Sequence, residues 1–188
     1  MRSIAQDAVR RVLLIACALS LSLSAAVGVH AAPTPEYLIK AAYLYNFALF
    51  VGWPADAFST PDAPIVIGIV GADPFDQALD RTVQNKRINR RPIVVRRLNW
   101  GSDLRQCHML FISASEAAKA ADMPARLEGL PILVVGESSD FARRGGTINF
   151  TLDDNKIRFE VNLDAAKKSR LDISAKLLNV ATRIVRGT

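Results

Sequence analysis

Small and polar residues follow several short apolar runs of this chain, and their types and spacing suit the binding of a small ligand. If these runs are parallel strands of one sheet, their carboxyl ends meet at one edge, where open α/β sheets bind ligands. The candidates for this crevice are Gly71, Asp73, Ser113, Ser115, Gly136 and Glu137, joined by Arg158 and Asn162 from a later run. The same residue types also serve as ordinary turn and cap residues, so the sequence leaves both interpretations open.

Residues for covalent, acid–base or metal chemistry form no recognisable constellation. No serine, histidine and aspartate pattern marks a nucleophile, and His108 lies inside an apolar run that favours a core role. Gly71 follows a predicted strand, but the glycine pattern of a dinucleotide-binding site is incomplete here. We therefore interpret Gly71 as a tight turn, with a phosphate site at the start of the following helix as the alternative. Residues 153–155 carry three oxygen donors, but the remaining ligand spacing of a calcium site is absent, so we predict a hairpin turn here. We predict no catalytic residue, metal or cofactor, and an unrecognised enzyme stays a minor alternative.

Aromatic residues concentrate in one segment, residues 43–53, of a chain otherwise poor in them. The segment lies in a predicted helix that starts at Thr34 and Pro35 and ends before Pro54. A core stripe at positions 37, 41, 44, 45, 48 and 51 leaves a second ridge of aromatics partly off the stripe. With Trp53, this ridge supplies the candidates for binding a protein partner: Tyr43, Phe47, Phe50 and Trp53. The alternative is a helix that is buried on two sides.

The first 31 residues have the pattern of a secretory signal peptide. A basic start with Arg2, Arg10 and Arg11 precedes an almost uncharged apolar run, and small residues at 29–31 suit cleavage before Ala32. An uncleaved anchor and a lipoprotein signal at Cys17 are weaker interpretations. We therefore expect a protein exported to the periplasm that does not insert into the membrane after cleavage.

Charge and cysteine content bound the exported part further. Residues 1–31 hold three Arg and one Asp, so the remainder carries 21 Lys and Arg against 17 Asp and Glu, a net charge of +4. Such a mild excess in an exported protein argues against a nucleic-acid partner. Cys107 is the only cysteine after residue 31, so an intramolecular disulfide is excluded. We interpret it as a buried thiol, with an intermolecular bridge or redox sensor as the alternative.

Strand and helix patterns alternate over most of the chain. Apolar β-branched runs predict strands at 65–70, 93–98, 110–112 and 132–135. Between them we predict helices at 74–83 and 116–121, the second followed by a further turn to residue 127. Such alternation favours parallel pairing with right-handed crossovers. After residue 143 the pattern predicts an edge hairpin from 147–152 and 157–161, a short helix at 163–168 and a closing helix at 173–185. The fold class is an α/β three-layer sandwich, Rossmann- or flavodoxin-like, in a single domain over residues 32–188.

The chain resembles the YfiR/HmsC-like family of periplasmic regulators. The most specific block is Y-x-x-K-A-A-Y-L-Y-N-F-x-x-F-V-x-W-P at 37–54, and L-D-I-S-x-K-L-L at 171–178 closes the match. Between them lie I-G-I-V-G at 67–71, D-P-F at 73–75, C-H-M-L-F-I-S-x-S-E at 107–116, L-V-V-G-E at 133–137, F-A-x-x-G-G-x-I-N-F at 141–150 and R-F-E-V-N at 158–162.

The resemblance implies a non-enzymatic protein that binds the periplasmic sensor domain of an inner-membrane diguanylate cyclase and represses it. Repression lowers cyclic di-GMP and biofilm formation. Leu171 and Leu178 of the closing block join the first-helix aromatics as candidates for partner binding or a homodimer. The paired cysteines of known relatives do not carry over, because only Cys107 stands at such a position. The alternative function is a periplasmic small-ligand sensor module for another membrane receptor or kinase.

Overall fold

The computed structural model describes residues 34–120 and 122–186. The expected signal peptide at 1–31 lies outside these residues. Within them, most of the backbone pairs into one sheet of eight strands, in the order β10-β8-β7-β6-β5-β2-β4-β3, and β1 pairs with β9 in a second, two-stranded sheet. The strands are β1 (Val51–Gly52), β2 (Ile65–Val70), β3 (Arg87–Ile88), β4 (Arg91–Leu98), β5 (Met109–Ile112), β6 (Leu133–Gly136), β7 (Ile148–Asp153), β8 (Lys156–Asn162), β9 (Asp172–Ile173) and β10 (Arg183–Val185).

Parallel pairing joins the centre of the large sheet, as the alternation of the sequence predicts. β2 pairs in parallel with both β4 and β5, and β6 pairs in parallel with β5 and β7. All six residues of β2 are buried, which is the pattern of a strand covered on both faces. Antiparallel pairing occurs at β7–β8 and β3–β4, toward the two ends of the sheet.

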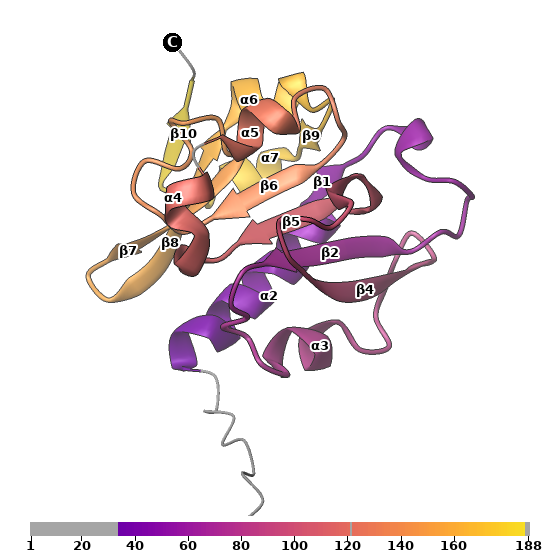
Figure 1. Ribbon diagram of the computed structural model, residues 1–188, viewed down its shortest axis with the longest axis horizontal. Coiled ribbons are helices and arrows are strands. Elements are labelled where there is room, and N and C mark those ends of the chain that lie inside the picture. The colour runs from indigo at the N-terminus through magenta and orange to yellow at the C-terminus, as the bar shows by residue number, and fades with distance from the viewer. Residues whose placement is uncertain (1–33, 121, 187–188) are drawn as a thin grey trace, which may run out of the picture. The chain divides into compact units, whose positions relative to one another are not determined.

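Helices cover both faces of the large sheet and make the fold a three-layer α/β sandwich (Figure 1). The long helix α2 and the shorter α3 pack on one face, whereas α4 and α5 lie over the other. The helices are α2 (Pro35–Phe50), α3 (Ala78–Val83), α4 (Ala117–Ala120), α5 (Met123–Arg126), α6 (Leu163–Lys168) and α7 (Ala175–Leu178). Short 3₁₀ turns occur at Ala55–Ala57, Leu104–Gln106 and Ala114–Glu116. No helix in the described part of the chain is both long and apolar enough to span a bilayer.

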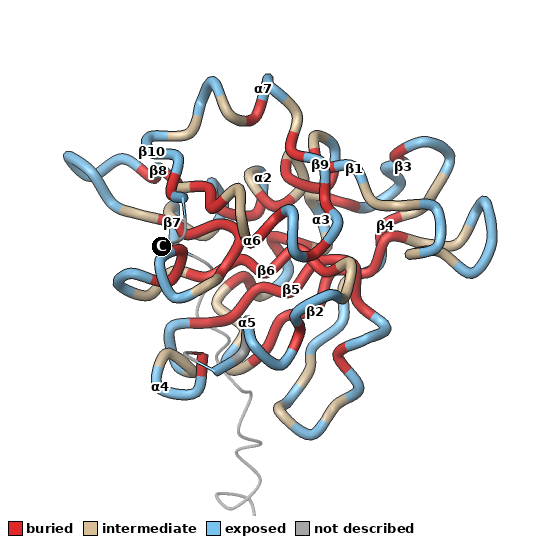
Figure 2. Tube along the Cα trace, turned by 90° about the horizontal axis from the view of Figure 1, so that it is seen from above, coloured by how far each residue is buried: buried red, intermediate tan, exposed pale blue. Residues whose placement is uncertain are grey.

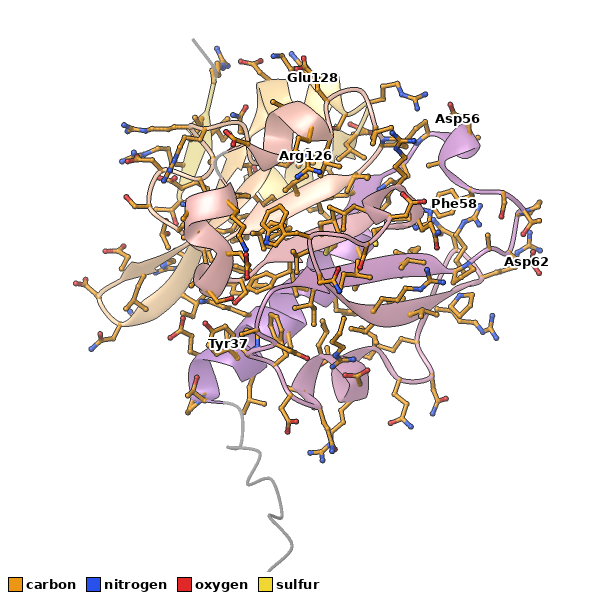
Figure 3. The ribbon with its side chains drawn as sticks, in the orientation of Figure 1. Tyr37, Asp56, Phe58, Asp62, Arg126 and Glu128 are labelled. Atoms are coloured by element: carbon orange, nitrogen blue, oxygen red, sulfur yellow. The ribbon has the colours of Figure 1, made fainter. Side chains whose placement is uncertain are left out.

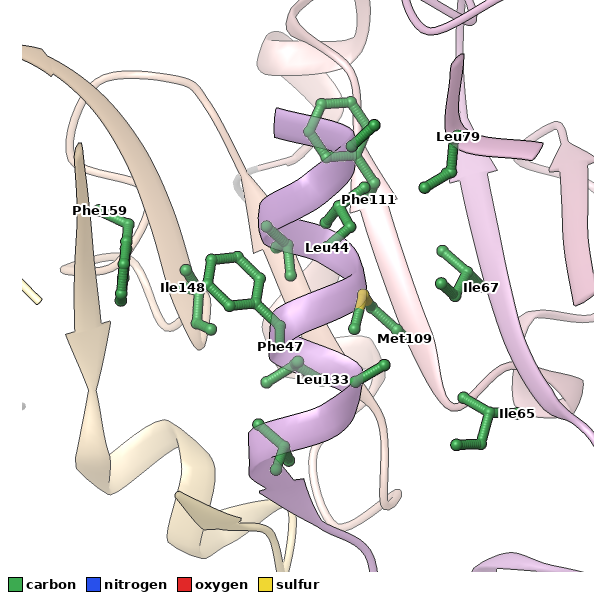
Figure 4. Close-up of a cluster of buried hydrophobic side chains, with 14 of the residues drawn as sticks. Leu44, Phe47, Ile65, Ile67, Leu79, Met109, Phe111, Leu133, Ile148 and Phe159 are labelled. Carbon is green, nitrogen blue, oxygen red and sulfur yellow. The ribbon is translucent and has the colours of Figure 1, made fainter. Parts of the chain in front are cut away.

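The core divides into two clusters, one on each face of the sheet, and Figure 4 shows the cluster on the α2 side. Alternate residues of β2 point to opposite faces, so Ile67 joins the α2 side and Val66 the α4 side. On the α2 side, Leu44 and Phe47 of the helix meet Met109 and Phe111 of the sheet. The central strands β2, β5 and β6 are buried along their whole length, and the burial pattern of the chain can be followed in Figure 2.

The predicted closing helix at 173–185 is wrong. Ile173 belongs to β9, which pairs antiparallel with β1, and only Ala175–Leu178 is helical, with the Ser174 hydroxyl accepting from the Leu177 N–H at 3.3 Å. Arg183–Val185 instead forms β10, which pairs in parallel with β8. The exposed edge of β8 offers unpaired backbone groups, and a β-branched segment satisfies them better as a strand than as a helix. The β7–β8 hairpin forms as predicted but does not lie at the sheet edge, because β10 covers it.

Two further expectations need correction near the opposite edge. The second helix begins at Ala78 rather than residue 74, because the Asp73 carboxylate accepts from the Phe75 N–H at 2.8 Å and Asp76 has a φ of 49°. The strand predicted at 93–98 begins earlier, at Arg91, and the residues before it form a hairpin in which Arg87 and Ile88 pair with β4. Its two turn residues, Asn89 and Arg90, both have positive φ, which matches the right-handed twist of the strands.

Candidate functional site

The carboxyl ends of β2, β5 and β6 meet as expected, and they bring four of the predicted crevice residues together. Gly71 has a φ of 97°, and a Cβ there would lie 2.5 Å from Glu116 and 2.7 Å from Ser115. The Ser115 hydroxyl accepts from the Ala72 N–H at 3.0 Å and donates to the Ser113 hydroxyl at 3.3 Å. The carboxylate of Glu137 accepts from the Ala114 N–H at 3.0 Å. These groups therefore bond to one another across the strand ends.

A lysine from α2 enters the same place. Lys40 is only 5% exposed, and its Nζ lies 2.6 Å from Glu137 and 2.5 Å from Glu36. The Tyr37 hydroxyl donates to Glu137 at 3.2 Å, and the Lys40 ammonium lies 4.6 Å from the Tyr37 ring centre. Burial, together with the charges of Glu137 and Glu36, raises the pKa of the Tyr37 phenol far above its usual range. Lys40 and Tyr37 thus tie the start of α2 to the strand ends.

The remaining crevice candidates serve other contacts. Asp73 pairs with Arg97 at 2.8 Å, and the Phe141 ring lies within 2.6–2.7 Å of where a Gly136 side chain would begin. Arg158 is exposed on the β7–β8 hairpin. Asn162 is buried, donates to the Ala142 carbonyl at 2.7 Å and caps α6 by accepting from the Ala165 N–H at 2.9 Å. Structural roles therefore account for most of the predicted ligand residues.

Asn162 also borders a cavity away from the strand-end crevice. The cavity has a volume of about 530 Å³ and lies between α5, the loop before β7 and α6. Its charged lining includes Arg143, Arg144, Lys168 and Glu128. A mixed set of charges around a space of this size suits a small polar ligand.

The first-helix aromatics form a ridge, but the expectation that it is exposed is wrong for Phe47. Phe47 is 0% exposed, and its ring centre lies 5.1 Å from that of Phe159 and 5.6 Å from that of Phe150 (Figure 4). Tyr43 is half-buried and stacks on Phe47 at 5.9 Å. Phe50 and Trp53 are also half-buried. The ridge packs on the β7–β8 hairpin, which supplies the second side on which α2 is covered.

The two partner-binding candidates of the closing segment, Leu171 and Leu178, also differ in burial. Leu171 is buried in the core, whereas Leu178 is half-buried. Exposed apolar side chains lie just beyond them at Val180 and Ile184.

The face of α2 that points away from the sheet was not among the predicted partner-binding surfaces. We name Leu38, Ile39, Ala42, Tyr45 and Leu49 the α2 outer face; Tyr45 is half-buried and the other four are exposed. A signal for this face was present, because the sequence has no charged residue between Lys40 and Asp56, and Lys40 is buried. A helix that is apolar all round is typically covered on all sides.

A second cluster of side chains surrounds His108, for which the sequence predicts only a core or edge role. Its Nδ1 accepts from the Val66 N–H at 3.1 Å, so the ring proton sits on Nε2, 3.1 Å from the Ala57 carbonyl. The Phe58 ring stacks on the imidazole at 4.4 Å, and the Arg91 guanidinium lies 3.6 Å from the centre of the Phe58 ring. Burial lowers the pKa of His108, and the charge of Arg91 adds to this effect. Figure 3 labels Tyr37, near the amino end of α2, and Phe58, which follows the 3₁₀ turn at Ala55–Ala57.

Cys107 is buried and free of a disulfide. Burial raises the pKa of its thiol to about 11, which keeps it protonated and poorly nucleophilic at neutral pH. In the described ranges no group of three or more His, Cys, Asp or Glu side chains is placed to hold a metal ion.

Comparison with known proteins decides the family. A sequence profile described as YfiR/HmsC-like matches residues 37–182. The chain belongs to the YfiR/HmsC-like family. Members of this family are known as periplasmic regulators of cyclic di-GMP signalling, and the family is regulatory and non-catalytic. A search of the curated proteins finds no match to this YfiR/HmsC-like chain.

A solved structure shares the fold of this family member at low sequence identity. A conserved domain protein of Vibrio cholerae O1 biovar El Tor superposes with a TM-score of 0.54 at 10% identity. The match covers 79% of this chain and 60% of the Vibrio chain, so the YfiR/HmsC-like chain spans less than two thirds of that protein. An ABC domain of Streptococcus pneumoniae in complex with L-Trp gives a TM-score of 0.48 at 8% identity, covering 64% and 55% of the two chains.

Proposed function

We propose that this protein binds the periplasmic sensor domain of an inner-membrane diguanylate cyclase and holds the cyclase inactive. The expected result is less cyclic di-GMP and less biofilm. Membership of a family of periplasmic regulators supports the proposal, as does the export signal expected at residues 1–31. The protein would act by binding, without catalysis.

The α2 outer face is the observation that carries this proposal. Leu38 is 52% exposed and Leu49 is 43% exposed, and both lie on a helix whose Lys40 is buried in an ion pair. Removing apolar surface from water contributes about 25 cal/mol per Å² to association. An apolar face without its own charges therefore suits a protein partner better than it suits open solvent.

Repression by such a protein is a matter of differential affinity. A binding protein shifts the cyclase toward its inactive state only as far as it binds that state more tightly than the active one. Moving the ratio of the two states from 1:99 to 99:1 takes about 5.5 kcal/mol of differential binding. Val180 and Ile184 at the closing segment offer a second apolar patch, which suits either the same partner or a homodimer.

Deletion of the gene tests the proposal. We expect cellular cyclic di-GMP and biofilm mass to rise in the deletion strain and to return to the parental level when the wild-type gene is restored. An unchanged cyclic di-GMP level would reject cyclase repression in that host.

The second candidate function is a small-ligand sensor module for another membrane receptor, which the cavity between α5 and α6 favours. A ligand held at about 100 times its dissociation constant adds about 2.7 kcal/mol to the stability of the folded protein. Thermal unfolding of the purified protein across a panel of small polar metabolites would detect it. Replacement of Lys168 by Met should remove any such shift, since Lys168 lines the cavity.

A further inference from the structure

A second surface feature lies at the carboxyl end of α2. A concave pocket of about 320 Å³ opens between α2, the loop after β1 and the β3–β4 hairpin. Leu49, Trp53, Phe58 and Ile88 supply apolar lining, and Arg91 stands at the hairpin side. Figure 2 shows β3 close to β1, and residues of both strands line this pocket.

The pocket walls are fixed by contacts below them. Phe58 contacts both the guanidinium of Arg91, at 3.6 Å, and the imidazole of His108, at 4.4 Å. Trp53 donates from its indole Nε1 to the His108 carbonyl at 3.1 Å. Arg91 also donates to the carbonyls of Thr60 and Ala63. A preformed wall of this kind lowers the entropy cost of binding.

Positive charge lies on the hairpin next to Ile88, Asn89 and Arg91, the hairpin residues that line the pocket. Lys86, Arg87 and Arg90 are exposed, and in the described part of the chain none of them is paired with a carboxylate. Lys86 lies 4.1 Å over the ring of Tyr45, which connects this rim to the α2 outer face.

The nearby carboxylates do not balance the positive charge of the hairpin. Asp56 pairs with Arg170 at 2.7 Å, and Asp62 accepts from the Thr60 hydroxyl at 2.9 Å. Asp62 keeps its negative charge, and the carboxylate of Asp172 lies beside Gly52 of the pocket. The four cations of residues 86–91 outnumber these two acids, so the net charge here is positive.

We propose that this basic-rimmed pocket binds an acidic segment of a protein partner that carries one large apolar side chain. The apolar side chain enters the pocket beside Leu49 and Phe58, and carboxylates of the same segment meet Arg87 and Arg90. The proposal rests on the proposed function, because it names the chemistry of the partner segment.

Two alternative roles for the cations fit less of the structure. Cations at an edge strand also prevent unwanted strand pairing, but that role needs no aromatic pocket beside them. An anionic membrane surface would meet the cations, yet a planar surface offers no single anchor for a concave site. Charge complementarity together with concavity favours the acidic segment.

Peptide binding tests this directly. Two fluorescein-labelled pools of peptides of about 12 residues are compared by anisotropy, one rich in Asp and Glu and one with Lys and Arg at the same positions. Wild-type protein should prefer the acidic pool. Arg87→Glu/Arg90→Glu should weaken that binding about tenfold, because attraction at two sites becomes repulsion. Leu49→Asp should weaken it by blocking the anchor. Arg126→Glu/Lys156→Glu changes the net charge equally at exposed sites elsewhere and should bind as wild type does.

Circular dichroism and melting of each variant confirm that it is folded. Equal or absent binding of the two pools would overturn the proposal, as would unchanged binding by the Arg87→Glu/Arg90→Glu variant. Binding to phosphatidylglycerol vesicles with which the acidic pool does not compete would assign the rim to a membrane surface instead. These outcomes are independent of the cyclic di-GMP level in the deletion strain, so failure of one idea is separable from failure of the other.

Discussion

Lys40 occupies polar groups of the strand-end crevice that could otherwise bind a ligand. Its ammonium lies between two carboxylates, and Glu137 also accepts from a backbone N–H and from Tyr37. The polar groups that an open crevice would offer to a ligand are thereby used to hold α2 on the sheet. Burying such a charge is costly unless every partner is in place.

We predict that the Lys40→Met variant loses about 3–5 kcal/mol of unfolding free energy, because it leaves Glu137 charged and buried without its main partner. Lys40→Met/Glu137→Gln should lose clearly less, since both charges are then gone and the amide oxygen still accepts hydrogen bonds. Urea unfolding of the wild type, of Lys40→Met, of Glu137→Gln and of the double variant gives the coupling free energy between the two side chains. Additive losses would contradict a coupled buried pair.

His108 predicts a pH dependence. Its pKa is lowered in the folded state from the usual value of 6.5, so below that pH the unfolded chain binds the proton more tightly than the folded one. Its contribution to stability is complete above pH 6.5 and is lost as the pH falls below it. The urea midpoint should therefore decrease between about pH 7.5 and 5.5.

The His108→Gln variant is the control for this effect. It will be less stable at every pH, but its midpoint should change little across that window. His30 lies in the expected signal peptide, so His108 is the one histidine of residues 32–188. An equally steep decrease in the variant would assign the pH dependence to other groups.

At the scale of elements, α2 has a buried inner face and an outer face on which Leu38 and Leu49 are exposed. We predict that Phe47→Ala costs about 3–5 kcal/mol, because it empties a fully buried aromatic site. Leu38→Ala should change stability by no more than about 0.5 kcal/mol. Thermal unfolding of the two variants compares the faces, and a large loss in Leu38→Ala would mean that the outer face serves stability.

Elements with a strong local pattern could be predicted from the sequence. β2 is a buried β-branched run, and the Leu163–Lys168 helix has Asn162 as its cap, so local chemistry alone determines both. The structure confirms these two elements with the predicted bounds. The four crevice residues that meet at the strand ends were also predictable, because parallel topology places them there.

Elements determined by distant partners could not be predicted. The apolar spacing of residues 173–185 fits a helix, but the edges of β1 and β8 recruit Ile173 and Arg183–Val185 as strands. Glu137 lies 97 residues from Lys40, so no local pattern shows that they pair. Likewise, Phe47 is buried because the β7–β8 hairpin folds over it. In each case tertiary contacts override the local signal.

At the scale of the whole molecule, these features describe a binding protein. In the described residues, the α/β sandwich carries two adjacent surfaces, the α2 outer face and the basic-rimmed pocket, with Tyr45 and Lys86 between them. The family is regulatory and non-catalytic. The polar groups at the strand ends form hydrogen bonds with one another. Function is therefore expected to follow surface complementarity.

The most direct test of this account is cellular cyclic di-GMP in a deletion strain complemented with Leu38→Glu or with Leu152→Glu. Both replace an exposed leucine, at 52% and 63% exposure, but only Leu38 lies on the α2 outer face. At equal periplasmic abundance, we predict that Leu152→Glu restores the low cyclic di-GMP level and Leu38→Glu does not. Equal restoration by both variants would contradict the claim that the α2 outer face holds the cyclase inactive.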